Sequence, residues 1–103
     1  MQQCVTIIYP NKPGARFDFE YYVSTHVPMW KKFLGGEKIE VRRGVATHNG
    51  SQVQFICLVR IWLDSSIDDF MTRFKNEAHH IIADIPHYTN IEPVIQFDQV
   101  LIP

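Results

Sequence analysis

Hydrophobic and polar positions along this chain follow two different periods, and the period changes at clusters of turn-forming residues. Short runs rich in β-branched and apolar residues predict strands at residues 4–9, 38–47, 53–63 and 94–102. Two longer segments repeat apolar residues every three or four positions and predict amphipathic helices, at residues 18–34 and from residue 67 to about residue 84. The predicted order is β-α-β-β-α-β.

The first predicted helix carries signals at its start, its middle and its end. Asp18 lies in the first turn, where a carboxylate accepts backbone N–H groups and meets the positive end of the helix dipole. Pro28 lacks a backbone donor, so we expect the helix to break near that residue. Gly35 and Gly36 then stop the helix.

The second predicted helix follows two serines, Ser65 and Ser66, that can cap it, with Asp68 and Asp69 placed as in a capping box. Its apolar stripe consists of Ile67, Phe70, Met71, Phe74, Ala78, Ile81 and Ile82. Between the two central strands, the strongest hairpin signal of the chain is Asn49-Gly50-Ser51.

This order of elements predicts an α+β, ferredoxin-like fold, in which a four-stranded antiparallel sheet carries both helices on one face. In the third strand, one face is filled by Val53, Phe55, Cys57, Val59, Ile61 and Leu63. The other face still carries Ile56, Leu58 and Trp62, interrupted by Gln54 and Arg60. Burying one such large side chain is worth about 1.5–3 kcal/mol. We therefore expect a homodimer packed sheet to sheet; the alternative is a monomer with an exposed apolar sheet face.

Length and composition favour one globular domain, residues 1–103, with 46% hydrophobic and 20% charged residues. The net charge of −1 leaves no basic surface for nucleic acid or for a membrane. No run of 18 apolar residues is present, and no charged region precedes the first apolar run. We expect a cytoplasmic protein, in which Cys4 and Cys57 are buried, reduced thiols.

His26 is the first candidate for chemistry. The apolar series Phe19, Tyr22, Val23 has His26 as its next position, so a titratable ring lies where a core residue belongs. Imidazole suits proton transfer near neutral pH. An apolar pocket that still offers hydrogen bonds could be formed by Tyr21, Tyr22, Trp30 and, from the far end of the chain, Tyr88. A histidine buried only for packing is the alternative.

Asp84 is the second candidate, either as a helix-terminal cap or as the group that orients His26. Tyr9, at the end of the first strand, could face the same pocket or be a core aromatic residue. The other histidines, His48, His79, His80 and His87, are expected at the surface. No metal-binding or nucleotide-binding motif is present, so we expect neither a metal site nor a tightly bound cofactor.

Three segments together resemble the EthD family, named for a protein linked to ethyl tert-butyl ether degradation. They are TIIYPNKPGARFD near the start, YYVSTHVP at residues 21–28 and ADIPHYTNIEPVIQ at residues 83–96. The resemblance covers nearly the whole chain and implies a dimeric α+β barrel, two ferredoxin-like protomers whose sheets close on each other. His87 stands where family members often have Asn, and the loop before the third strand is shorter than usual.

The resemblance implies a small-molecule enzyme. We expect cofactor-independent chemistry on a hydrophobic carbonyl or aromatic substrate, either an oxygenation or an isomerisation, with His26 as general acid and base. Both reactions begin with removal of a proton, so the sequence does not separate them. The alternative is a non-catalytic carrier or accessory protein of a degradation pathway.

Overall fold

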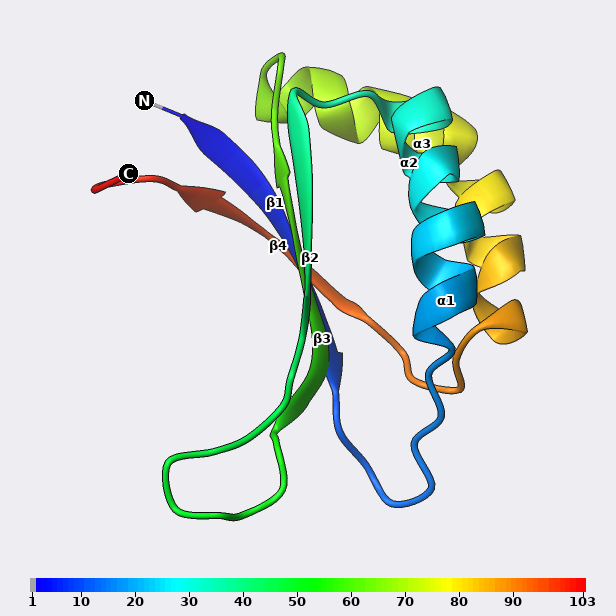
Figure 1. Cartoon of the computed structure of the whole chain (residues 1–103). Coiled ribbons are helices and arrows are strands. Elements are labelled where there is room, and N and C mark those ends of the chain that lie inside the picture. The colour runs from blue at the N-terminus through cyan, green and yellow to red at the C-terminus, as the bar shows by residue number, and fades with distance from the viewer. Residues whose placement is uncertain (1) are drawn as a thin grey trace.

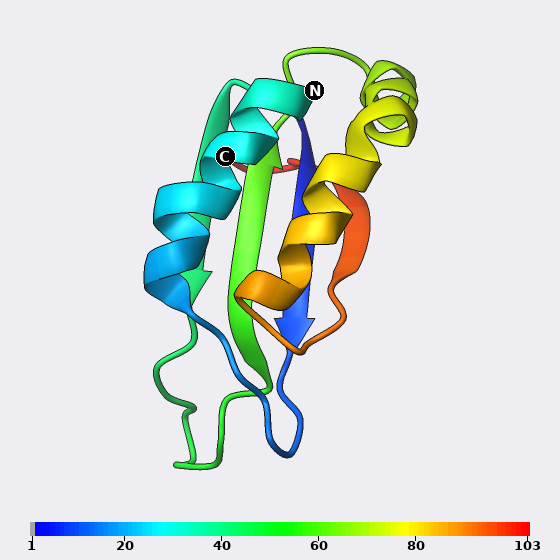
Figure 2. The same cartoon turned by 90° about the vertical axis from the view of Figure 1, so that its right-hand side faces the viewer.

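The computed structural model describes residues 2–103 and has the predicted order of strands and helices. Strands β1 (Gln3–Pro10), β2 (Lys38–Arg43), β3 (Phe55–Trp62) and β4 (Val94–Gln99) form one antiparallel sheet in the order β2-β3-β1-β4. The helices form a second layer that covers one face of this sheet (Figures 1 and 2). The ferredoxin-like prediction is confirmed, and among residues 2–103 no helix is long and apolar enough to cross a bilayer.

The first helical segment consists of α1 (Phe19–Tyr21), the π-helical turn η1 (Tyr22–His26) and α2 (Val27–Leu34). Asp18 caps its start, because the Asp18 carboxylate accepts from the Tyr21 backbone N–H at 3.1 Å. The predicted break near Pro28 is wrong. The helix continues through Pro28, and the irregularity lies one turn earlier, where the Val27 N–H donates to the Tyr22 carbonyl. A wider turn gives the Pro28 ring room beside the preceding carbonyls.

The wider turn also changes which side chains face the sheet. Tyr22 and His26 are buried, whereas Val23, predicted on the buried face, is 54% exposed. The prediction assumed 3.6 residues per turn throughout, and a π-helical turn holds more residues than that.

The second long helix, α3 (Ile67–Asp84), is followed by the 3₁₀ turn η2 (Ile85–His87). The Ser66 hydroxyl accepts from the Asp69 backbone N–H at 3.0 Å, which confirms the predicted cap. The predicted apolar stripe is broader than the buried one. Phe70 and Ile81 are buried, but Met71 is 53% and Ile82 56% exposed, because the stripe spans more of the helix circumference than the sheet covers.

The strands are shorter than predicted at four ends, by one residue where β3 stops at Trp62 and by more at the other three. β2 stops at Arg43, β3 begins at Phe55 and β4 stops at Gln99. β2 and β3 form the predicted antiparallel hairpin, but a loop of residues 44–54 joins them, and the turn at residues 48–50 lies at the tip of this loop (Figure 1). Phe55, expected on the helix-covered face, is 40% exposed, at the point where the β1–β3 register becomes irregular.

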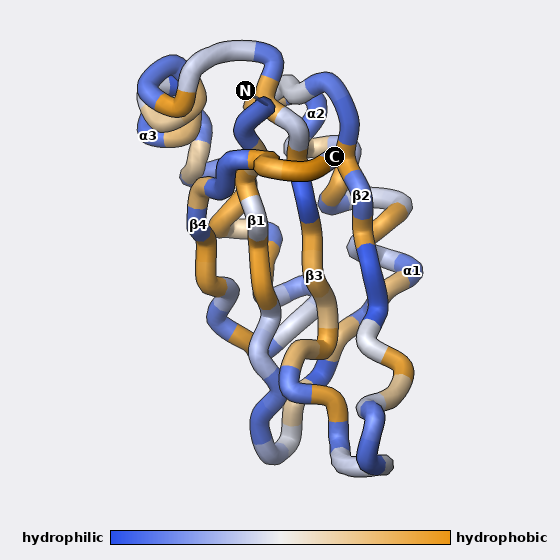
Figure 3. The backbone as a smooth tube through the Cα atoms, turned by 90° about the vertical axis from the view of Figure 1, so that its left-hand side faces the viewer, coloured by the Kyte–Doolittle hydropathy of each residue, from blue (hydrophilic) through white to orange (hydrophobic). Residues whose placement is uncertain are grey.

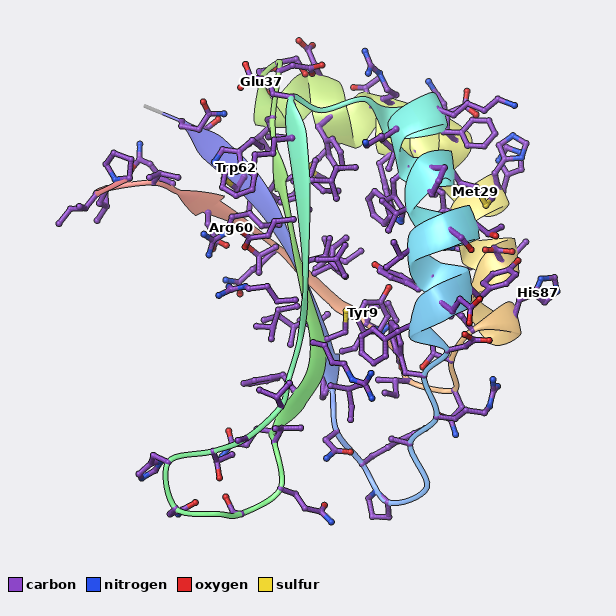
Figure 4. The ribbon with its side chains drawn as sticks, in the orientation of Figure 1. Tyr9, Met29, Glu37, Arg60, Trp62 and His87 are labelled. Carbon is purple, nitrogen blue, oxygen red and sulfur yellow. The ribbon has the colours of Figure 1, made fainter. Side chains whose placement is uncertain are left out.

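The core lies between the sheet and the helices. Its sheet side is formed by alternate residues of the two central strands, Cys57 among them. Cys4 and Cys57 are both free and buried, as predicted. Tyr9 points from β1 toward the helices, whereas Arg60 and Trp62 extend from the opposite face (Figure 4). The sheet thus has one fully packed face and one helix-free face.

The helix-free face combines an apolar row with a polar one. Ile8 pairs with Leu58 on one side and with Val94 on the other, so these three side chains share this face. The next row carries Thr6, Arg60 and Gln96. Figure 3 views this face and shows hydrophobic stretches along β1 and β3. The face is less uniformly apolar than the sequence pattern of β3 alone predicted.

Candidate active site

His26 and Asp84 meet at the inner side of the helical layer. His26 is the last residue of η1 and Asp84 the last residue of α3, and the His26 ring is completely buried. The His26 Nδ1 atom lies 2.9 Å from Asp84 Oδ2. An ionised carboxylate only accepts hydrogen bonds, so Nδ1 carries the proton and Nε2 of the neutral ring is an acceptor.

Two further groups contact the same carboxylate. The Tyr21 hydroxyl donates to Asp84 Oδ1 at 2.7 Å, and the His87 Nδ1 atom lies 3.2 Å from that oxygen. Asp84 is almost fully buried, whereas the His87 side chain is 65% exposed and projects outward (Figure 4). The carboxylate therefore connects the buried histidine to the protein surface.

A chain of hydroxyl groups continues from the other side of the His26 ring. The Tyr88 hydroxyl lies 3.3 Å from His26 Nε2, and the Tyr9 hydroxyl lies 2.9 Å from that of Tyr88. Because Nε2 is an acceptor, Tyr88 donates to it, and the single Tyr9 proton points either to the Tyr88 oxygen, 2.9 Å away, or to the Tyr22 oxygen, 3.4 Å away. The result is a continuous hydrogen-bonded chain from Asp84 through His26 and Tyr88 to Tyr9.

Pairing between two loops holds Tyr88 in place. The Asp18 backbone N–H donates to the Tyr88 carbonyl at 2.8 Å, and Phe17 forms a β-bridge with Thr89. The Thr89 hydroxyl donates to the Arg16 carbonyl at 2.7 Å. The loop before the first helix therefore fixes the loop after η2, which brings both ends of the chain to the site.

Burial and hydrogen bonding set the charges of the pair. Burial lowers the pKa of His26 below its ordinary value, and the hydrogen bond and charge of Asp84 offset this effect only in part. For Asp84, burial raises the pKa, but hydrogen bonds from Tyr21 and His26 outweigh it and hold the pKa below the ordinary value. At neutral pH the pair is a neutral imidazole beside a carboxylate. Burial also raises the pKa values of Tyr9 and Tyr88, which keeps both phenols protonated.

An apolar cavity of about 250 Å³ adjoins this chain of groups. Its polar part is formed by Tyr9, His26, Trp30, Tyr88 and Glu92, and the rest of its lining consists of Ile7, Phe74, Ile81, Ile82, Ile85, Pro93 and Ile95. The exposed side chains of Ile82 and Ile95 belong to α3 and β4, so the cavity is bordered by these two elements. The cavity is large enough for a small organic molecule.

Five of the six predicted site residues belong to this arrangement. Four of them line the cavity, and Asp84 lies behind His26. Tyr22 is placed differently. It is buried, stacks on the His26 ring with centroids 5.2 Å apart and does not line the cavity. Tyr22 therefore packs against the His26 ring inside the core, because the π-helical turn directs the Tyr22 side chain inward.

The sequence interpretation missed two contacts, those of Tyr21 and His87 with Asp84. His87 was expected at the surface, where it lies, but its position three residues after a helix-terminal carboxylate was a signal for a local pair. Tyr21 offered no such signal, because its contact spans 63 residues. Among residues 2–103, no group of three or more His, Cys, Asp or Glu side chains could hold a metal ion.

Comparisons with known proteins were made with the sequence and with the fold. No family model matches the sequence, and no curated protein matches it. An EthD-like protein of known structure from Ralstonia eutropha JMP134 is 33% identical, with a TM-score of 0.90, over 98% of this chain and 93% of that protein. An EthD family protein from Bacillus halodurans C-125 is 15% identical, with a TM-score of 0.68, over 98% of this chain and 100% of that protein. The second similarity shows the fold alone.

Proposed function

This chain belongs to the EthD family, and from that premise we propose that it is an enzyme acting on a small hydrophobic substrate with a carbonyl or aromatic group. His26 acts as general base and then as general acid. The observation that carries the proposal is the hydrogen-bonded chain from Asp84 through His26 to Tyr88, at the wall of an apolar cavity. Buried titratable groups beside a cavity are typical of catalytic sites.

In the proposed step, a proton leaves the substrate and reaches His26 Nε2 through the Tyr88 hydroxyl. Tyr88 gives its own proton to Nε2 while its oxygen takes the substrate proton, so the phenol remains neutral. The imidazolium that forms is stabilised by the Asp84 carboxylate 2.9 Å away. Return of the proton to a different substrate atom completes an isomerisation. In an oxygenation, the deprotonated substrate instead reacts with O₂, without a bound cofactor.

Deuterium exchange tests proton removal without knowledge of the natural substrate. 2-Acetylnaphthalene has a methyl group whose protons exchange with D₂O when a base forms the enol, and ¹H NMR follows the loss of the methyl signal. We expect the protein to accelerate this exchange. The His26→Gln variant should lose about 100-fold or more of that acceleration, since general bases typically contribute 10²–10⁴.

The matched control is His79→Gln, which changes an exposed histidine of α3 that lies outside the cavity. This control should exchange like the unmodified protein. If His26→Gln binds the ketone and supports exchange at the unmodified rate, His26 is not the base and the proposal fails.

A carrier without catalytic activity is the second candidate. The observation that favours a carrier is that the Tyr88 hydroxyl already donates to the lone pair of His26 Nε2. Neither of these two side chains is exposed to solvent. A carrier would bind hydrophobic ketones with unchanged affinity in His26→Gln and would give no exchange above the buffer rate in either form. The exchange experiment therefore separates the two functions.

We also propose that the protein works as a homodimer whose protomers meet through the helix-free faces of their sheets. Ile8, Leu58 and Val94 form an apolar row on that face, and Val94 is 51% exposed. The C-terminal end extends on the same side of the sheet and carries the exposed residues Leu101 and Ile102 (Figure 1). This apolar row and the exposed apolar C-terminal end on the same side of the sheet support pairing with a second copy.

A further inference from the structure

The indole N–H of Trp30 has no hydrogen-bond acceptor. Trp30 is 4% exposed, and its Nε1 is the single buried side-chain nitrogen or oxygen without a partner among the residues that the structure describes. Its ring contacts the His26 ring, 6.4 Å between centroids, and the Phe74 ring, 6.3 Å. Buried donors are nearly always paired, so an unpaired one next to a cavity indicates a missing acceptor.

The other side-chain hydrogen-bond donors that line the cavity are already engaged. The Tyr88 hydroxyl donates to His26, and the Tyr9 hydroxyl lies 2.9 Å from that of Tyr88. Among the side chains of the lining, Trp30 therefore supplies the one hydrogen-bond donor that a ligand can use without breaking an existing bond. An oxygen with a lone pair is the simplest acceptor for it.

The charges around the cavity restrict what that oxygen can belong to. Glu92, at the exposed part of the lining, is the one carboxylate that borders the cavity, and no lysine or arginine belongs to the lining. Asp84 adds a second negative charge behind His26. An anionic ligand would lose its hydration and gain no cationic partner, which is strongly unfavourable.

We propose that this cavity binds uncharged, mainly apolar molecules whose carbonyl oxygen accepts the Trp30 Nε1–H, and that it rejects the corresponding carboxylates. This proposal names the class of ligand for the cavity of the proposed function. It depends on the proposed function only because both concern this cavity. Less than 1 Å² of the nitrogen is open to solvent, so the proposal requires that side chains around it move when the ligand binds.

Three probes of one shape isolate the contribution of the carbonyl: 2-acetylnaphthalene, 2-ethylnaphthalene and 2-naphthoate. The chain contains two tryptophans, so a ¹H–¹⁵N spectrum shows two indole signals, and Trp62 on the opposite face of the sheet is an internal reference (Figure 4). We expect the ketone to move the Trp30 Nε1–H signal downfield, as a new hydrogen bond does. The ethyl probe should leave that proton without a downfield shift of this kind.

The affinities of protein variants for the three probes provide an independent test. Trp30→Phe keeps an aromatic ring and removes the donor, so it should weaken ketone binding about five- to tenfold and ethyl-probe binding less than about twofold. The control Trp62→Phe should leave both affinities unchanged. The naphthoate should bind at least about tenfold more weakly than the ketone. Glu92→Gln removes a negative charge from the lining, so it should reduce this difference in affinity.

The proposal is overturned if the ketone binds without a downfield shift of the Trp30 signal, or if Trp30→Phe weakens both neutral probes equally. Failure of all the neutral probes to bind overturns it too, because the cavity would then not accept this class of ligand. The proposed function fails separately. Ketone binding through Trp30 with no His26-dependent deuterium exchange would leave this inference intact and remove the catalytic role.

Discussion

A single imidazole links the two halves of this protein. His26 holds Asp84 through one ring nitrogen and Tyr88 through the other, and these contacts span 58 and 62 residues of the sequence. Its ring is also stacked on Tyr22, with a centroid separation of 5.2 Å. At the scale of the residue, the site depends on a neutral, fully buried histidine, and this has a consequence for stability.

The first prediction concerns the pH dependence of folding. Burial lowers the pKa of His26 in the native state, so below about pH 6.5 the unfolded chain binds a proton that the native state does not. The free energy of unfolding should therefore fall as the pH drops from 6.5 toward the native pKa, by at most about 1.4 kcal/mol per pH unit for this one group. Urea unfolding at several pH values measures this slope.

The comparison uses His26→Gln, which cannot take up the proton, and His79→Gln, which removes an exposed histidine. The slope between pH 6.5 and 5 should be smaller in His26→Gln and unchanged in His79→Gln. Equal slopes in all three proteins would mean that the native state protonates His26 as readily as the unfolded chain does.

The second prediction concerns the hydroxyl between His26 and Tyr9. Tyr88→Phe keeps the packing of the ring and removes the group that relays the proton, so deuterium exchange of 2-acetylnaphthalene should slow by about 10- to 100-fold. Its affinity for the ketone should change little. The control His79→Gln changes an exposed residue of α3 outside the cavity and should change the rate less than about twofold. Unchanged exchange in Tyr88→Phe would exclude the relay.

At the scale of the element, each functional residue lies at the end of a helical segment. η1 turns His26 inward immediately before α2, and α3 carries Asp84 in its last position. The length and start of α3 therefore determine where the carboxylate lies. α3 spans 18 residues from a serine cap to this carboxylate, so its stability depends partly on the cap.

The third prediction tests that cap. Ser66→Ala leaves the Asp69 N–H without its acceptor and should lower the free energy of unfolding by about 1 kcal/mol. The neighbouring Ser65 does not accept from the α3 backbone, so Ser65→Ala should stay within about 0.5 kcal/mol of the unmodified protein. Urea unfolding at pH 7 measures both. A Ser65→Ala effect as large as that of Ser66→Ala would show that the cap is assigned to the wrong serine.

At the scale of the whole molecule, the protein has two layers and one uncovered surface. The helices cover one face of the sheet (Figure 2). The cavity lies between α3 and the β1–β4 side of this face. The other face carries Ile8, Leu58 and Val94 in one row, with arginines nearby at Arg42 and Arg60. The proposed dimer would bury this row.

The fourth prediction follows from that row. Leu58→Arg places a cation beside Arg42 at the centre of the proposed interface, where it would be buried without a partner. Light scattering at micromolar concentration should give twice the chain mass for the unmodified protein and the mass of one chain for Leu58→Arg. The control Met71→Arg changes an exposed residue of α3 and should remain dimeric. A monomeric unmodified protein would contradict the dimer.

Local features of the sequence determined the order of the elements, the caps at Asp18 and Ser66 and the burial of His26. They could do so because strand and helix periodicity and capping depend on residues within a few positions of one another. The same local reasoning failed at Val23 and Pro28, because a π-helical turn is a small adjustment of helix geometry that the apolar pattern does not encode.

Only the tertiary structure decided which groups the buried histidine contacts. The bonds to Asp84 and Tyr88, and the free indole N–H of Trp30, result from the packing of α3 against α2 and from the pairing of residues 16–18 with residues 88–89. The cavity likewise exists because two helices and an edge strand leave space between them. Such distances depend on how whole elements pack, and no stretch of neighbouring residues contains that information.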